Sequence, residues 1–162
     1  MTRTTSRPAH LPPARSTPDG WPDGERQGGE RQDGAKRAVA GELVKVLLHR
    51  REDRGMTVEP YRSRCVRAGE LHELVSTDVD DATAGTRVDR VGFLGFTEIS
   101  RAGVIDSGDT VWIGGRPVGT VLGFDACHFP NHYNILISTG EPVTGEELGL
   151  VPETEVRFIA RG

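Results

Sequence analysis

The chain has 162 residues, of which 35% are hydrophobic, and a formal net charge of −4. The charge is uneven: 7 basic and 5 acidic residues give +2 over residues 1–40, whereas 13 basic and 19 acidic residues give −6 over residues 41–162. A body of that charge argues against nucleic acid as a partner, because nucleic-acid affinity depends largely on neutralising phosphates.

Residues 1–40 predict a disordered, low-complexity tail. Five of the ten prolines lie within its first 22 positions, and it contains almost no aliphatic run. Such a segment buries too little apolar surface to offset the entropy that ordering would cost. We therefore expect a single β-barrel-like domain over residues 41–162, a length that suits one domain.

The sequence also indicates where the protein resides. No stretch has the apolar character of a signal peptide or a membrane-spanning helix. We therefore expect a cytoplasmic protein with no membrane partner. In that compartment Cys65 and Cys127 would remain free thiols.

The first half of the body predicts strands. Residues 43–50 alternate over part of their length, which favours a strand, with a helix as the alternative. Residues 61–67 alternate with a period of two, which places Tyr61 and Cys65 on one face and the arginines on the other. Two glycines within residues 91–99 indicate bulges or close backbone approaches.

The second half contains the clearest hairpin, in which residues 111–113 and 118–124 flank the turn 114–117. Short polar segments at residues 98–101 and 144–147 could each form one helical turn. Several short strands, glycine-rich turns and no long helix predict a mainly all-β fold, a small antiparallel β-barrel or sandwich with one or two short helical turns. A barrel with exposed edges makes a homodimer plausible.

One stretch concentrates reactive side chains between two apolar runs. Its polar members are Asp125, Cys127, His128, Asn131, His132, Tyr133 and Asn134. Pro130 cannot donate to a sheet ladder, so we expect the bend there. One arm would then carry Asp125, Cys127 and His128, facing His132 and Asn134 on the other arm at the mouth of the barrel, where such folds hold ligands.

Two kinds of chemistry fit this loop. His128, His132, Asp125 and Cys127 are side chains that bind zinc and other divalent transition metals, which would make a metal site. Without a metal, the two histidines could act as acid and base, with Asp125 orienting one of them. Cys127 could then be a nucleophile if a histidine lowers its pKa.

A purely structural interpretation competes with both. Cys127 would then be a small buried side chain, His132 and Asn134 would cap backbone groups, and Tyr133 would belong to the core. If the loop is a site, Asn134 could hydrogen-bond a reacting group.

Other candidates for ligand contacts are weaker. Asn131 and Tyr133 within the loop, Glu98 on a strand and Arg116 in the hairpin turn could bind a ligand, and His72 could join the site across the barrel. Arginines could also form an anion clamp, with solvated strand faces as the alternative. The arginines considered for this role are Arg62, Arg64, Arg67 and Arg116.

The segments Gly123-Phe124-Asp125 and His128-Phe129-Pro130-Asn131-His132-Tyr133-Asn134 resemble small uncharacterised β-rich proteins of high-GC actinobacteria. The resemblance extends over residues 92–158 and brings no assigned activity. It implies a setting in the biosynthesis or modification of a small metabolite.

Two functions follow as hypotheses. The first is a small-molecule-binding β-barrel, either an enzyme or an accessory protein of small-metabolite biosynthesis, with the polar loop as its site. The alternative is a non-catalytic protein-interaction module whose disordered tail recruits a partner.

Overall fold

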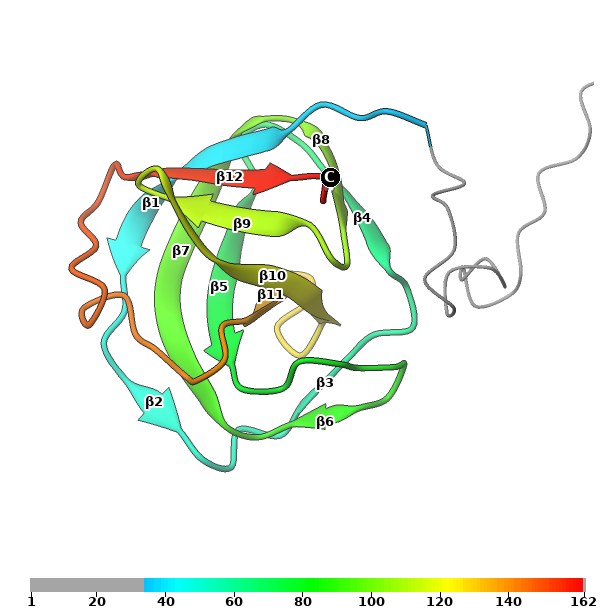
Figure 1. The fold of residues 1–162 in the computed structure, drawn as a ribbon, viewed down its shortest axis with the longest axis vertical. Coiled ribbons are helices and arrows are strands. Elements are labelled where there is room, and N and C mark those ends of the chain that lie inside the picture. The colour runs from blue at the N-terminus through cyan, green and yellow to red at the C-terminus, as the bar shows by residue number, and fades with distance from the viewer. Residues whose placement is uncertain (1–33, 162) are drawn as a thin grey trace, which may run out of the picture.

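The chain forms an all-β structure in which one large sheet curls around a core (Figure 1). The computed structural model describes residues 34–161. Its strands are β1 (Val39–Val46), β2 (Arg50–Arg51), β3 (Met56–Thr57), β4 (Ser63–Val66), β5 (Leu71–Thr77), β6 (Arg87–Val88), β7 (Val91–Arg101), β8 (Gly103–Asp106), β9 (Thr110–Ile113), β10 (Arg116–Asp125), β11 (Asn134–Ser138) and β12 (Glu155–Ile159).

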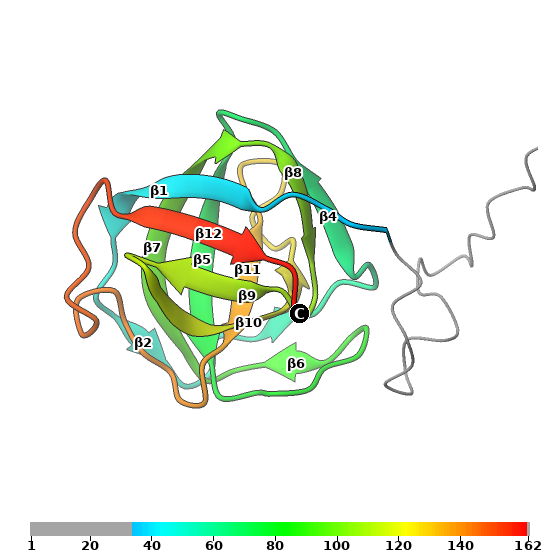
Figure 2. The same cartoon turned by 45° about the horizontal axis from the view of Figure 1, so that its top comes forward.

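The large sheet has eight strands in the order β1-β12-β9-β10-β11-β5-β7-β2. Strand β1 also pairs with β7, so the sheet nearly closes a ring (Figures 1 and 2). All its pairings are antiparallel except that of β11 with β5, which makes the sheet mixed rather than antiparallel as expected. Within residues 34–161, no helix is long and apolar enough to cross a membrane.

Apolar side chains from every strand of the ring meet inside it. The largest buried members of this interior cluster include Phe124, Phe158, Leu43, Leu74 and Ile135. They come from strands on opposite sides of the ring, which places the main core within the curled sheet. The strand predicted over residues 43–50 is confirmed for residues 43–46, because β1 begins earlier, at Val39, and ends at Val46.

A second apolar cluster lies on the outside of the sheet. The short ribbon of β3 and β6 contributes Met56 and Val88, which pack against Val75 of β5 and Leu136 of β11. The outer face of these strands is therefore covered rather than solvated. The apolar run of residues 135–137 in β11 is continuous because both faces of that strand are buried.

The ribbon of β4 and β8 packs against one end of the interior cluster, to which it contributes Val66 and Ile105. Arg64 lies two positions before Val66 and so shares its inward face, whereas Cys65 is exposed. The predicted orientation, with Cys65 inward and the arginines outward, was therefore wrong. The guanidinium of Arg64 stacks on an aromatic ring, Tyr133, which accounts for its inward position.

Most of the turns predicted from the sequence are present in the structure. Gly114 and Gly115 have φ of 60° and 77° and join β9 to β10 in the predicted hairpin. The predicted turn at residues 144–147 is present, since the amide of Leu148 donates to the carbonyl of Thr144. The turn predicted at residues 98–101 is absent, because those residues continue strand β7.

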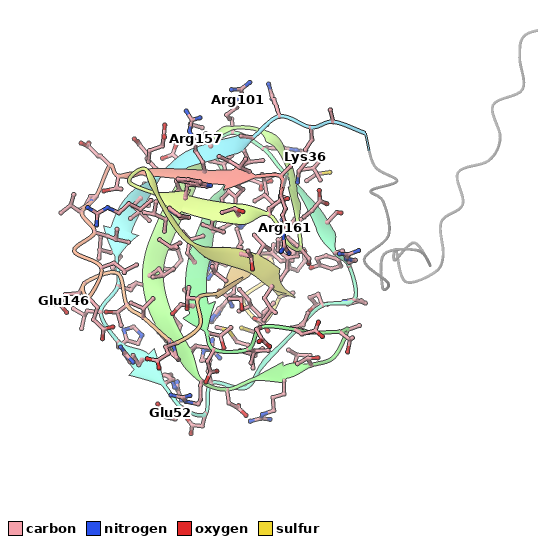
Figure 3. All side chains as sticks on the ribbon, in the orientation of Figure 1. Lys36, Glu52, Arg101, Glu146, Arg157 and Arg161 are labelled. Atoms are coloured by element: carbon pink, nitrogen blue, oxygen red, sulfur yellow. The ribbon has the colours of Figure 1, made fainter. Side chains whose placement is uncertain are left out.

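The N-terminal boundary differs from the expected position. Lys36 enters the fold beside β8 (Figure 3), where its Nζ lies 2.6 Å from Asp106 Oδ2 and 2.5 Å from Asp109 Oδ2. Part of the segment assigned to the tail is therefore bound to the domain. The prediction of disorder for the rest of the tail concerns residues 1–33, which lie outside the described residues.

Candidate functional site

Three polar side chains form a row across neighbouring strands of the barrel wall. Asp125 of β10 pairs with Asn134 of β11, and Asn134 pairs with Glu73 of β5. All three are buried, with exposed fractions of 3%, 0% and 7% respectively. Adjacent residues of a strand point to opposite faces, and the strand neighbours of the three belong to the interior cluster: Phe124, Ile135 and Leu74.

The row therefore lies on the outer face of the wall, not at the mouth of the barrel where the sequence placed it. Interior space at this level is filled by the apolar neighbours. The loop of residues 126–133, which joins β10 to β11, lies beside the row and supplies His132. The expected arrangement of its two arms is present, since Asn134 Nδ2 contacts both Asp125 and Cys127, and the rings of His128 and His132 stack with centroids 4.9 Å apart.

Asp125 is an ionised anchor for the loop. Its carboxylate accepts hydrogen bonds from the amide of Thr57 at 2.9 Å, the amide of Cys127 at 3.1 Å and Asn134 Nδ2 at 2.9 Å. Burial acts to raise the pKa of this carboxyl, but the hydrogen bonds from Cys127, Thr57 and Asn134 outweigh it, so the net pKa is lowered.

Glu73 has the opposite character. Burial raises the pKa of its carboxyl, Arg54 acts against that rise, and the charge of Asp125 adds to it. Among residues 34–161 no hydrogen bond reaches this carboxyl. Its nearest polar neighbour is His132, whose Nε2 lies 3.6 Å from Oε2, within reach of an ion pair but too far for a hydrogen bond.

His132 faces Glu73 as a neutral imidazole. Burial lowers its pKa, and the nearby His128 and His72 lower it further. The side chain of Asn134 acts in the opposite direction and raises this pKa. Asn131 Nδ2 lies 2.8 Å from Nδ1. If that amide donates, the ring proton is on Nε2 and points toward Glu73.

Two buried polar atoms beside Glu73 have no hydrogen-bond partner among residues 34–161. They are His132 Nε2 and Asn134 Oδ1. The amide nitrogen of Asn134 is fully engaged, so its orientation is fixed by Asp125 and Cys127. An orphaned buried acceptor costs about 1–3 kcal/mol, so a donor that reached Asn134 Oδ1 would relieve this cost.

Arg54, Cys127 and His128 form the exposed rim of the site. Arg54 Nη2 lies 2.9 Å from His128 Nε2 and 3.5 Å from Cys127 Sγ. Burial raises the pKa of the Cys127 thiol, and Asp125 raises it further through a hydrogen bond and its charge. Because neither histidine hydrogen-bonds to Sγ within the described residues, the condition for a nucleophilic Cys127 is not met.

The metal hypothesis gains no support from the geometry. Across residues 34–161, no three side chains of His, Cys, Asp or Glu are placed to hold a metal ion. Asp125 already accepts three hydrogen bonds from protein groups. We therefore do not assign His128, His132, Asp125 and Cys127 as ligands.

The structure brings together five of the predicted residues: Asp125, Cys127, His128, His132 and Asn134. Asn131 supports His132, whereas Tyr133 faces the other side of the wall and contacts Arg64. Glu98 and Arg116 are exposed, and no hydrogen bond or ion pair among the described residues joins them to this loop.

Sequence reasoning missed Glu73 and Arg54. A signal for Glu73 was available, because it is a carboxyl within the strand-like run of residues 71–75, next to Leu74. A carboxyl in such a run is either a solvated outward residue or a buried functional one, and the alternation alone does not separate the two. Arg54 gave no signal, since it lies in a charged turn.

A family model described as a family of unknown function (DUF6917) matches residues 33–159, and the chain belongs to this family. The match covers every strand of the structure. No curated protein and no solved structure is significantly similar to the chain.

Proposed function

We propose that this member of the DUF6917 family binds a small polar molecule on the outer wall of its barrel, and that Glu73 and His132 exchange protons with it. One observation carries the proposal. The Glu73 carboxyl and the His132 imidazole face each other at 3.6 Å without a hydrogen bond, and each side chain is only 9% exposed. A ligand group that lies beside both atoms can hydrogen-bond with each of them and so bridge this buried acid and base.

The two carboxyls of the row divide the roles. Asp125 has a lowered pKa and stays ionised, whereas Glu73 has a raised pKa and can carry a proton closer to neutrality. When the pKa values of two carboxyls are shifted in opposite directions, the group with the lowered pKa acts through its charge or by positioning. The group with the raised pKa can act as an acid or base. Asp125 positions Asn134 and the loop, and Glu73 performs the proton transfer.

The orphaned atoms define what the ligand must offer. Asn134 Oδ1 requires a hydrogen-bond donor, such as a hydroxyl, amine or amide group. His132 Nε2 requires an acceptor if it is protonated and a donor if it is not. A ligand with neighbouring donor and acceptor groups satisfies all three side chains.

A setting in the biosynthesis or modification of a small metabolite rests on the sequence resemblance alone, and the cytoplasmic location stays a prediction from the sequence. Partner recruitment by the N-terminal tail stays a prediction, because all of that segment except residues 34–40 lies outside the described part of the chain. The homodimer also stays a prediction.

The proposal is tested by native mass spectrometry of the full-length protein after incubation with the small-molecule fraction of a cell extract. The variants are Glu73→Gln and His132→Asn, and the matched control is Glu98→Gln, which neutralises an exposed carboxyl. We expect a recurrent adduct mass in the wild type and in the control, and its loss in the two site variants. Elemental analysis of the same samples tests the metal hypothesis separately.

Two results would contradict the proposal. One is the absence of any recurrent adduct in the wild type. The other is an adduct that persists at the same occupancy when Glu73 and His132 are both replaced. Far-ultraviolet circular dichroism of each variant establishes whether a lost adduct reflects the site rather than the fold.

A further inference from the structure

A second cluster of polar and aromatic side chains lies on the other side of the same wall, at the end of the barrel covered by β4. Its members are Tyr61, Arg64, His72 and Tyr133. Tyr61 stacks on the interior residue Phe124 with ring centroids 6.0 Å apart, and Tyr133 meets Tyr61 edge-on at 6.4 Å. Tyr61, Arg64 and Tyr133 are half-buried, so the cluster borders both the core and the solvent.

Arg64 is the charged centre of this cluster. Its guanidinium carbon lies 3.3 Å from the centroid of the Tyr133 ring, an arrangement typical of a stacked cation–π contact. The Nε atom is buried and has no hydrogen-bond partner within residues 34–161. A guanidinium at this depth normally pairs with a carboxylate.

The nearby carboxylates do not supply that partner. Glu70 Oε2 lies 2.8 Å from His72 Nε2 and is used there. Glu59 acts electrostatically on Tyr61 but forms no ion pair with Arg64. In the described part of the chain, the positive charge of Arg64 is therefore left without an anion.

The neighbouring groups are neutral and include donors. His72 Nδ1 accepts the amide of Tyr133, which directs the ring proton to Nε2 and Glu70. Burial lowers the pKa of His72 and raises that of Tyr61, so both are uncharged at neutral pH. Tyr61 and Tyr133 lie edge to face, and each phenolic hydroxyl can donate one hydrogen bond.

We infer that Arg64, with the hydroxyls of Tyr61 and Tyr133, binds an oxyanion of a small molecule, a carboxylate or a phosphate group. The guanidinium offers the charge and a free N–H, and the hydroxyl pair offers a second donor. The planar fork of arginine matches both kinds of oxyanion. This subsite is separate from the proton-transfer pair, and the inference does not rest on the proposed function.

The test uses the full-length protein and two simple probes, inorganic phosphate and acetate, titrated at constant ionic strength so that screening does not change. The readout is the Nε–H resonance of Arg64 in a nitrogen-15 NMR spectrum. We expect one of the two anions to shift this resonance to saturation. The anion that saturates first identifies the preferred oxyanion.

Three variants separate the subsite from general charge attraction. Arg64→Lys keeps the charge but removes the fork, and Tyr61→Phe removes one hydroxyl. Arg67→Lys is the matched control, because Arg67 is exposed just beyond β4. We expect Arg64→Lys to weaken anion binding about tenfold or more, as judged by the anion-induced rise in the unfolding midpoint.

Tyr61→Phe is expected to weaken anion binding less than Arg64→Lys does, and Arg67→Lys is expected to leave anion binding unchanged. The inference is overturned if neither anion gives a saturable shift of the Arg64 resonance. Equal losses in Arg64→Lys and Arg67→Lys would overturn it too, since the attraction would then be diffuse. Loss of binding confined to Glu73→Gln would point to the other site and also count against it.

Discussion

The carboxyls of Glu73 and Asp125 lie in one row of the barrel wall, on either side of Asn134, and their pKa values are shifted in opposite directions. Asp125 is surrounded by hydrogen-bond donors, whereas no donor reaches Glu73 within the described residues. The difference arises because the backbone amides of Thr57 and Cys127 donate to Asp125 and not to Glu73. It gives the two carboxyls different affinities for a proton.

The raised pKa of Glu73 predicts how Glu73→Gln changes stability with pH. When the pKa of a carboxyl is higher in the folded than in the unfolded state, the folded protein becomes less stable as pH rises from the unfolded-state pKa to the folded-state pKa. Replacing Glu73 with Gln removes this decrease in stability. We expect the variant to gain stability relative to the wild type as pH increases from about 4.5 upward, measured by urea denaturation across the pH range.

The control for this prediction is Glu98→Gln, whose carboxyl is exposed. Its stability relative to the wild type is expected to stay constant with pH. If the stability of Glu73→Gln relative to the wild type fell as pH rises, the buried carboxylate would be stabilised by a partner, contrary to the structure.

His132 provides a second pH-dependent prediction. Its pKa is lowered by burial first and then by His128 and His72. The neutral ring is therefore the stable form in the folded protein, and protonation as pH falls below about 6.5 destabilises the fold. We expect His128→Ala to raise the pKa of His132, because it removes a neighbouring positive charge.

The measurement is an NMR titration of the imidazole resonances. His49→Ala is the control, since His49 packs against Phe93 and does not contact the loop. An unchanged His132 pKa in His128→Ala would mean that His128 does not contribute to the shift.

Cys127 is predicted to react slowly with alkylating agents. Its pKa is raised by burial and by Asp125, so little thiolate is present at neutral pH. Cys65 is also exposed and provides an internal comparison in the same molecule. We expect iodoacetamide to modify Cys65 faster than Cys127, with the sites distinguished by peptide mass spectrometry. Asp125→Asn should reduce the difference between the labelling rates of Cys65 and Cys127. Faster labelling of Cys127 than of Cys65 in the wild type would disprove the interpretation.

Gly92 predicts a stability effect outside the site. A Cβ built at this position would lie 2.4 Å from the carbonyl oxygen of Val143, which belongs to the segment after β11. Gly92→Ala should therefore destabilise the protein by about 1–3 kcal/mol, measured by urea denaturation. Gly34→Ala is the matched control, because nothing lies within 4 Å of its Cβ position. Equal stability of the two variants would contradict the close approach.

Local features of the fold could be predicted from the sequence, because their causes are local. The two glycines of the hairpin have φ above zero, and Pro130 lies in the turn that joins β10 to β11. The loop residues were recognised for the same reason, since they are contiguous. Glu73 was not, because its place beside Asn134 depends on a parallel pairing between segments far apart in the sequence.

The orientation of β4 was missed for a different reason. A period of two identifies which residues share a face but not which face is inward. Arg64 was assigned to the solvent because arginine is charged, yet its planar guanidinium can stack on a tyrosine. The continuation of β7 through residues 98–101 was missed because its outer residues are polar, as expected at an exposed strand end.

The parallel contact of β5 with β11 also bears on how the protein folds. This contact joins strands that are far apart in the sequence, so the entropy of closing a long loop is lost before the contact stabilises the fold. Glu73 therefore meets Asn134 and His132 only after the ring has assembled. Hydrogen exchange or ligand binding at this row would thus report completion of the native topology, because none of the hairpins formed earlier contains the whole site.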